Sequence, residues 1–206
     1  MKLIIGLGNP GLKYEKTRHN LGFILIEKFL KEFSVGKNNI FRENKKFKAE
    51  IAEIEWTRKS TSGKKLKIIE KVILAKPITY MNNSGLSVRL ISDFYKIKPK
   101  DVWVLHDDLD FVLGGFKIKQ SGSSAGHRGI ESVIKNLGTE KFWRFRLGVG
   151  KPKNNSRLRS SEAYVLREFG HGETGEIRKL IKRGVKTIET ALEKGLDVAM
   201  NRYNSK

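Results

Sequence analysis

The chain has 206 residues, of which 42 are lysine or arginine and 22 are aspartate or glutamate, giving a formal charge of +20. It has no cysteine, which excludes disulfides and thiolate metal sites, and no apolar run reaches the roughly 18 residues that a membrane span needs. We therefore expect one cytoplasmic domain over residues 1–206 with no membrane segment. The basic excess favours a nucleic-acid partner, although a solvated lysine-rich surface has the same composition.

The first half of the chain alternates between strand and helix patterns. Residues 2–7 are apolar and β-branched, which predicts a buried strand, and residues 20–33 place apolar side chains on one helical face, with Asn20 suited to cap the helix. Residues 47–56 and 65–77 alternate as two strands. The basic, turn-rich RKSTSGKK between them predicts a hairpin loop.

The alternation continues past the middle of the chain. Residues 83–99 predict a helix that Pro99 helps to end, and a buried strand follows over residues 101–108. Residues 114–120 alternate as an edge-like strand. The small residues of SGSSAG, at 121–126, then predict a flexible connector.

The last part of the chain predicts one further strand and several helical turns. Residues 127–138 form an amphipathic pattern that ends at a glycine, and residues 142–150 alternate, with Arg144 and Arg146 on the polar side of the strand. The C-terminal third is helical. Because strands and helices interleave, we expect an α/β fold in which helices flank one twisted, mixed β-sheet.

The segment IIGLGNPG places its glycines on the G-x-G-x-x-G spacing, directly after the first strand, where dinucleotide-binding folds carry a phosphate loop. Pro10 removes one amide donor from this loop, the following residues read as loop, and no second strand ends in an acidic residue at the required distance. We therefore expect no NAD or FAD. The glycines instead predict a tight turn that brings Asn9 and His19 into a shared cleft.

Further polar side chains follow predicted strands or precede predicted helices, where α/β folds gather ligands. They are Tyr80, Asn82, His106, Asp107, Asp108, Asp110, His127 and Arg128. No serine lies in a nucleophile elbow and the histidines show no metal-binding spacing. The three aspartates leave open a cation site, a solvated turn or a partner for a histidine. The simplest chemistry is a histidine that activates water, held by an aspartate and flanked by amides.

Six segments, in this order, closely resemble bacterial peptidyl-tRNA hydrolase: GLGNPGLKYEKTRHNLGF, FKAEIAE, KPITYMNNSG, HDDLD, GGFKIKQSGSSAGHRGIESVIKNLG and FRLGVGKP. The likeness extends to the closing AMNRYN and so spans nearly the whole chain. It implies a carboxylic ester hydrolase that cuts the bond between a peptide's C-terminal carboxyl and the 3′ ribose of tRNA. We also expect a monomer that needs no cofactor or metal.

The resemblance assigns roles to four residues of the reacting centre. His19 matches the family's general base, and Asp107 matches the aspartate that orients it. Asn9 matches the residue that senses the peptide and rejects an unblocked amino group. Asn82 matches the amide that helps to hold substrate and water. An imidazole ordinarily titrates near pH 6.5, which suits a base that acts at neutral pH.

The resemblance also implies contacts with the tRNA. Tyr14 and Tyr80 match aromatic positions at the tRNA 3′ end, and His127 matches a position in a mobile gate loop. Three residues match basic positions that meet tRNA phosphates: Lys117, Lys119 and Arg146.

The chain departs from the family pattern at Arg128, where asparagine is common, at Tyr80, where phenylalanine is usual, and in the SGSSAG segment, where glycines often dominate. Arg128 is therefore either a phosphate contact or a solvent-exposed side chain. Two alternative functions remain open. One is a noncatalytic relative that binds structured RNA on the same fold, and the other is a metal-dependent phosphoesterase built on Asp107, Asp108 and Asp110.

Overall fold

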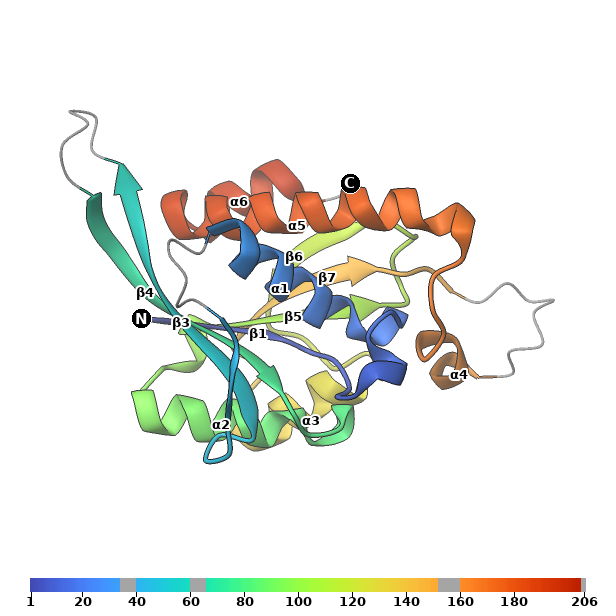
Figure 1. The fold of residues 1–206 in the computed structure, drawn as a ribbon, viewed down its shortest axis with the longest axis horizontal. Coiled ribbons are helices and arrows are strands. Elements are labelled where there is room, and N and C mark those ends of the chain that lie inside the picture. The colour runs from blue at the N-terminus through green and yellow to red at the C-terminus, as the bar shows by residue number, and fades with distance from the viewer. Residues whose placement is uncertain (34–39, 60–65, 152–159, 205–206) are drawn as a thin grey trace.

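A computed structural model describes residues 1–33, 40–59, 66–151 and 160–204. Within this part of the chain, one seven-stranded sheet has the order β2-β3-β4-β1-β5-β7-β6 (Figure 1). The strands are β1 (Lys2–Gly6), β2 (Arg42–Asn44), β3 (Ala49–Lys59), β4 (Leu66–Pro77), β5 (Val102–Asp108), β6 (Phe116–Gln120) and β7 (Trp143–Gly148). The pairs β1–β4, β1–β5 and β5–β7 are parallel, whereas β2–β3, β3–β4 and β6–β7 are antiparallel. The predicted mixed α/β sheet is confirmed.

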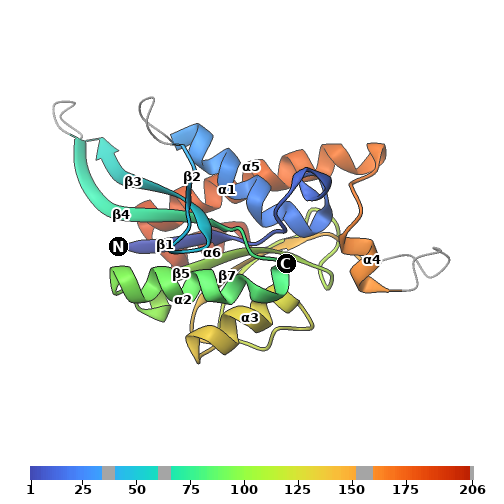
Figure 2. The same ribbon diagram turned by 60° about the horizontal axis from the view of Figure 1, so that its bottom comes forward.

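Helices cover both faces of this sheet. They are α1 (Leu21–Phe33), α2 (Ser84–Tyr95), α3 (Arg128–Leu137), α4 (Ser161–Val165), α5 (Thr174–Lys194) and α6 (Leu196–Tyr203). Helices α1, α5 and α6 lie on one face, α2 and α3 lie on the other, and α4 lies beyond the edge where β1 and β5 end (Figures 1 and 2). None of the described helices is long and apolar enough to cross a membrane.

Short 3-10 turns connect several of these elements. They are η1 (Leu12–Tyr14), η2 (Arg18–Asn20), η3 (Met81–Asn83), η4 (Pro99–Asp101) and η5 (His171–Glu173). The first two follow β1, where the sequence predicted a loop in place of the helix that a dinucleotide site needs.

Alternation along β1 explains why the sheet has a core on each face. Ile4 packs with the side chains of α1 and α5, whereas Leu3 and Ile5 pack with those of α2 and α3. All three side chains are fully buried. Burying each one contributes about 1.5–3 kcal/mol, so the two helical layers hold the central strand from both sides.

Glycines let α1 approach the ends of β1 and β5 closely. A Cβ atom on Gly22 would lie 2.3 Å from the carbonyl oxygen of Leu105, and one on Gly6 would lie 2.4 Å from the carbonyl oxygen of Gly22. Gly11 adopts a φ of 102°, which favours glycine, and turns the chain after β1. The glycine pattern therefore serves packing and a turn, and it places the start of α1 at the carboxyl ends of β1 and β5.

Two helix boundaries differ from the sequence predictions. Asn20 does not begin the first helix, because helical structure already starts at Arg18 in η2 and the Asn20 side chain pairs with the backbone of Asn9. Helix α2 ends at Tyr95 and is followed by Lys96, which takes a left-handed φ of 55°, and Pro99 starts the following 3-10 turn. Both differences arise from local turns, which the spacing of apolar residues along the sequence does not reveal.

Arg144 also differs from its predicted place on the polar side of β7, because it is only 5% exposed. The predicted hairpin loop at 58–65 lies mostly outside the described residues, which leave out 60–65. The strands on either side of it, β3 and β4, pair antiparallel as predicted.

Candidate active site

A cleft of about 420 Å³ opens where β1 and β5 end. Its walls come from the segment after β1, from η3, from the segment before α3 and from α4. The predicted site residues that line it are Asn9, Tyr14, His19, Tyr80, Asn82, Asp107, His127 and Arg128. The structure therefore brings together every predicted site residue except three basic ones, which lie on β6 and β7.

Asp107 is the centre of the polar network in this cleft. Its Oδ1 lies 2.9 Å from Nδ1 of His19 and 3.0 Å from Nε2 of His127, and the residue is only 1% exposed. Burial alone would raise the pKa of the Asp107 carboxyl, but the two histidines outweigh it and hold this pKa well below its usual value. An ionised carboxylate only accepts hydrogen bonds, so both ring nitrogens must donate to it.

The two histidines consequently have opposite tautomers. Nδ1 of His127 accepts from the backbone N–H groups of Gly129 and Ile130, at 3.1 and 3.2 Å, so its Nε2 carries the proton that Asp107 accepts. In His19 the proton lies on Nδ1, which leaves Nε2 free to accept one. His127 therefore caps α3 and is fixed in position, and His19 has the form that a general base requires.

A third histidine, the buried His106, packs against His127. The rings of His106 and His127 meet edge to face with centroids 4.8 Å apart, and Nδ1 of His106 donates to the carbonyl oxygen of Asp107 at 2.7 Å. Burial is the largest cause that lowers the pKa of His106 well below its usual value, and the proximity of His127 is the second. His106 is thus a neutral packing group beneath the site.

His19, Asp107 and His127 each offer one donor atom, and these atoms lie within 4.8 Å of one another, close enough to hold a metal ion. Ligation through Nε2 of His127 would move its proton to Nδ1. That proton would then point at the backbone N–H groups of Gly129 and Ile130, and the two hydrogen bonds that these groups donate to Nδ1 would be lost. The cap of α3 therefore opposes metal binding at this trio.

The aspartates after Asp107 are engaged by other groups. Asp108 accepts from Nε of Arg146 at 2.5 Å through Oδ2 and from the backbone N–H of Asp110 at 2.9 Å through Oδ1. Asp110 pairs with Lys151 at 3.0 Å. These contacts fit charge-paired carboxylates and do not favour the metal-dependent phosphoesterase.

Asn9 presents its amide to the cleft in a fixed orientation. Its Oδ1 accepts from the backbone N–H of Met81 at 2.9 Å, and its backbone N–H and C=O both pair with the side chain of Asn20 at 2.9 Å. Because Oδ1 is committed, the NH₂ group is the part of the amide left for the cleft. Sequence reasoning assigned Asn20 to a helix cap and missed this contact, because the position resembles that of an ordinary cap.

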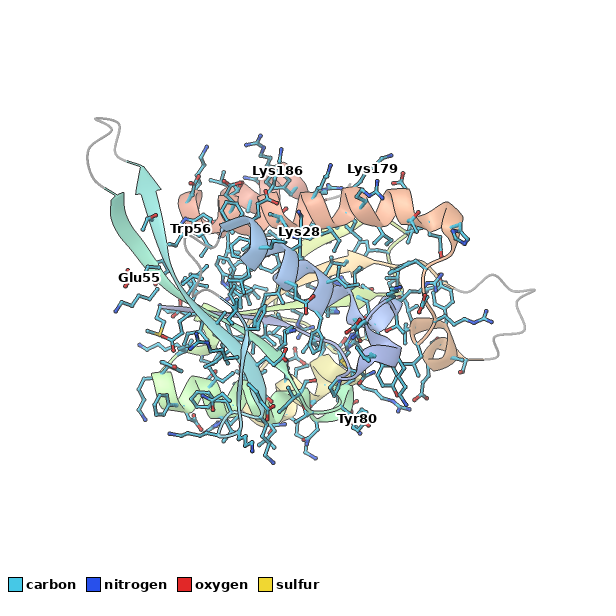
Figure 3. All side chains as sticks on the ribbon, in the orientation of Figure 1. Lys28, Glu55, Trp56, Tyr80, Lys179 and Lys186 are labelled. Atoms are coloured by element: carbon cyan, nitrogen blue, oxygen red, sulfur yellow. The ribbon has the colours of Figure 1, made fainter. Side chains whose placement is uncertain are left out.

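The remaining polar and aromatic residues lie nearer the surface. Tyr80 directly precedes η3 and is 62% exposed, and Figure 3 shows its side chain at the edge of the molecule. Asn82 is exposed within η3, and Tyr14 is half-buried in η1, with Nζ of Lys13 at 4.8 Å from its ring centroid. These positions suit contacts with a large ligand that lies across the opening.

The connector at 121–126, which the sequence predicts to be flexible, is in contact with Arg144. Arg144 donates from Nη1 to the carbonyl oxygen of Ser123 at 2.6 Å and from Nη2 to that of Gly122. Its guanidinium also lies 4.8 Å from the ring centroid of Phe142. Arg144 thus anchors the segment that leads to α3. Sequence reasoning missed this role, because the alternation of polar and apolar residues along 142–150 placed Arg144 on the solvent side of the strand.

The three basic residues outside the cleft form a group on neighbouring strands. Lys117 on β6 lies opposite Arg146 on β7, and Lys119 is exposed further along β6. Nζ of Lys117 and the guanidinium of Arg146 lie 5.9 and 4.5 Å from the ring centroid of Phe111. Since Arg146 also pairs with Asp108, this group joins the end of β5 beside the cleft.

A buried arginine ties the histidine turn to the segment that follows α4. Arg18, directly before His19, is 6% exposed. Its Nη1 donates to the carbonyl oxygens of Arg167 and Glu168 at 3.3 and 2.7 Å, and its Nη2 pairs with Glu173 at 2.6 Å. Sequence reasoning missed this residue, because its partners are about 150 positions away and no local pattern marks them.

Replacing Arg18 should destabilise the fold. Arg18→Met removes the donors from two carbonyl groups and a carboxylate, and we expect the free energy of unfolding to fall by about 3 kcal/mol. Urea denaturation measures this change. Lys28→Met, which removes one partner of the exposed Lys28–Glu32 pair, is the control and should change stability by less than about 0.5 kcal/mol. Equal effects of the two variants would contradict the role given to Arg18.

The profile of the family described as peptidyl-tRNA hydrolase matches residues 3–206. The chain belongs to this family. A peptidyl-tRNA hydrolase of Desulfitobacterium hafniense (strain Y51) is 42% identical over 204 residues, covering 99% of this chain and 100% of the relative. One from Aquifex aeolicus (strain VF5) is 40% identical over 204 residues, covering 99% and 96%.

Solved structures agree with this family membership. The crystal structure of peptidyl-tRNA hydrolase from Acinetobacter baumannii superposes with a TM-score of 0.83 at 29% identity. The match covers 100% of this chain and 95% of that one. The fold that surrounds the cleft is therefore the fold of the family.

Proposed function

We propose that the chain hydrolyses the ester bond between the C-terminal carboxyl of a peptide, or an N-blocked amino acid, and the 3′ ribose of tRNA. It would thereby release tRNA from peptidyl-tRNA that has left the ribosome early. The observation that carries the proposal is the 2.9 Å contact between Nδ1 of His19 and Oδ1 of Asp107, within the cleft of a chain that belongs to this family. We further propose that it works as one domain over residues 1–206, a cytoplasmic monomer that needs no cofactor or metal.

In the proposed reaction, His19 is the general base. Its Nε2 takes a proton from a water molecule while the water oxygen attacks the ester carbonyl carbon. The tetrahedral intermediate then collapses, the bond to the ribose 3′ oxygen breaks, and the imidazolium returns the proton to that oxygen. The Asp107 carboxylate holds the ring through Nδ1–H and stabilises the imidazolium while it exists.

Amide groups supply the remaining interactions in the proposal. The negative charge on the intermediate needs hydrogen-bond donors, each typically worth about 2.7–4 kcal/mol, and Asn82 lies at the cleft to provide one. The NH₂ group of Asn9, fixed by Met81, is the proposed sensor of the peptide. A free amino group in place of a peptide bond would leave it unpaired, which disfavours an unblocked substrate.

The tRNA is proposed to lie across the opening of the cleft. Tyr14 and Tyr80 would contact its 3′ end, and the basic group on β6 and β7 would meet its phosphates. Affinity for tRNA should then fall as salt increases. The residues assigned to these phosphates are Lys117, Lys119 and Arg146.

The test compares two substrates that differ in one group. Purified protein in EDTA is given N-acetyl-aminoacyl-tRNA and, separately, the matching free aminoacyl-tRNA. We expect rapid cleavage of the blocked substrate and little cleavage of the free one. Absence of cleavage together with tight, salt-sensitive tRNA binding would instead favour the noncatalytic RNA-binding alternative, and loss of cleavage in EDTA would contradict a metal-free reaction.

A further inference from the structure

An exposed ion pair joins two elements at the cleft. Arg128 is the first residue of α3, and Glu162 lies in the first turn of α4. Nη1 and Nη2 of the arginine lie 3.0 and 3.1 Å from Oε1 and Oε2 of the glutamate, so the pair is bidentate. Both side chains line the cleft, and they are 60% and 57% exposed. Helix α3 lies under the sheet and α4 beyond its edge, so the pair links two separate walls (Figure 1).

This pair differs in kind from the buried contacts of Arg18. Both partners are more than half exposed, and an exposed ion pair contributes little to folding stability. Separating Arg128 from Glu162 therefore requires little free energy. A guanidinium fork binds phosphate oxygens with the same bidentate geometry that it uses for a carboxylate, so an incoming phosphate can take the place of Glu162.

The backbone of Arg128 is held close to the reacting groups. His127 precedes it directly, and the His127 ring is fixed on one side by Asp107 and on the other by amides of α3. The backbone of Arg128 is therefore fixed near His19, the candidate general base. Its long side chain can move and carries a positive charge. The anionic groups of a tRNA that lie nearest its 3′ ester are the phosphates of its last nucleotides.

We propose that Arg128 binds a backbone phosphate at the 3′ end of the tRNA, and that Glu162 holds its guanidinium at the cleft until the phosphate replaces the carboxylate. The proposal rests on the proposed function, because it takes tRNA as the ligand. After the exchange, the carboxylate of Glu162 is unpaired and close to a phosphate of like charge. Glu162 therefore limits the affinity for tRNA and favours its release.

The exchange predicts opposite effects for the two partners. Binding of uncharged tRNA is measured over a range of salt concentrations, together with KM and kcat for N-acetyl-aminoacyl-tRNA. Arg128→Gln should raise Kd about 5- to 10-fold and reduce the log–log salt slope by about 0.7–1, the value of one phosphate contact. Glu162→Gln should lower Kd about threefold without reducing the slope, because the competing carboxylate is gone. KM should move in the same directions as Kd.

A matched pair on α2 controls for the loss of charge itself. Arg89 and Asp93 are in contact at 2.6 Å and are 50% and 57% exposed, and neither lines the cleft. Arg89→Gln and Asp93→Asn change the net charge as the test variants do, and each should alter Kd by less than about twofold. Changes as large as those at the cleft would show that net charge alone explains the effect.

Two results would overturn the proposal. If Arg128→Gln and Glu162→Gln shift Kd in the same direction, the pair only links α3 to α4. If neither exceeds the controls, Arg128 makes no phosphate contact. Uncharged tRNA has no ester, so the binding measurement stands apart from catalysis. A wild-type protein that binds tRNA but does not cleave the ester would overturn the proposed function alone.

Discussion

His19→Ala is expected to lower the rate of ester cleavage by about 10³- to 10⁴-fold while tRNA binding stays within about twofold of wild type. The variant removes the only ring nitrogen that the Asp107 network leaves ready to take a proton in the cleft as described. The basic and aromatic residues that would meet the tRNA remain. Single-turnover cleavage of N-acetyl-aminoacyl-tRNA measures the rate, and titration with uncharged tRNA measures binding.

His171→Ala is the matched control for this variant. His171 is exposed in η5 and does not line the cleft, so the same substitution there should leave the rate within about twofold of wild type. Unchanged cleavage in His19→Ala would remove His19 as the base. Loss of tRNA binding in parallel with the rate would mean that His19 acts in binding.

Asp107→Asn is expected to lower the cleavage rate by about 10²- to 10⁴-fold. Oδ1 of Asp107 accepts from two ring nitrogens. If the asparagine oxygen takes this place, both contacts remain but the charge that stabilises the imidazolium of His19 is lost. If the asparagine NH₂ group takes it, His19 must move its proton to Nε2 and can no longer act as the base.

Asp110→Asn is the control for the loss of a carboxylate near the end of β5. Asp110 also lines the cleft, but it pairs with Lys151 and contacts neither histidine in the described network. Its variant should keep the rate within about threefold of wild type. Thermal unfolding of both variants shows whether the fold is retained. An equal loss in the two variants, or no loss in Asp107→Asn, would contradict the central role of Asp107.

Local patterns predicted the layers of the fold well, because the spacing of apolar residues and the turn-forming residues determine structure within a few positions of the chain. Helix α3 is an example: the sequence predicted 127–138, and the structure starts the helix after the His127 cap and stops it at Gly138, where φ is 69°. The grouping of the site was also predictable. Asn9 follows β1 and Asp107 lies at the carboxyl end of β5, and the carboxyl ends of such parallel strands meet at one edge of the sheet.

Contacts between distant segments were not predictable from such patterns. Arg18 and Arg144 look like surface residues in their own segments, yet their donors find backbone carbonyl groups that only the folded chain brings near. His127 illustrates the same limit. Its place before a helix was evident, but its two hydrogen bonds to α3 and its contact with Asp107, which together set its tautomer, depend on tertiary structure.

One carboxylate, that of Asp107, holds two histidines in opposite tautomers and so leaves Nε2 of His19 as the proton acceptor. Long-range ¹H–¹⁵N spectra of the imidazole groups at neutral pH test it directly, with His19→Ala and His127→Ala spectra to assign the signals. We expect a proton on Nδ1 and none on Nε2 for His19, and the reverse for His127. A proton on Nε2 of neutral His19 would contradict it, because that nitrogen could then take no proton from water.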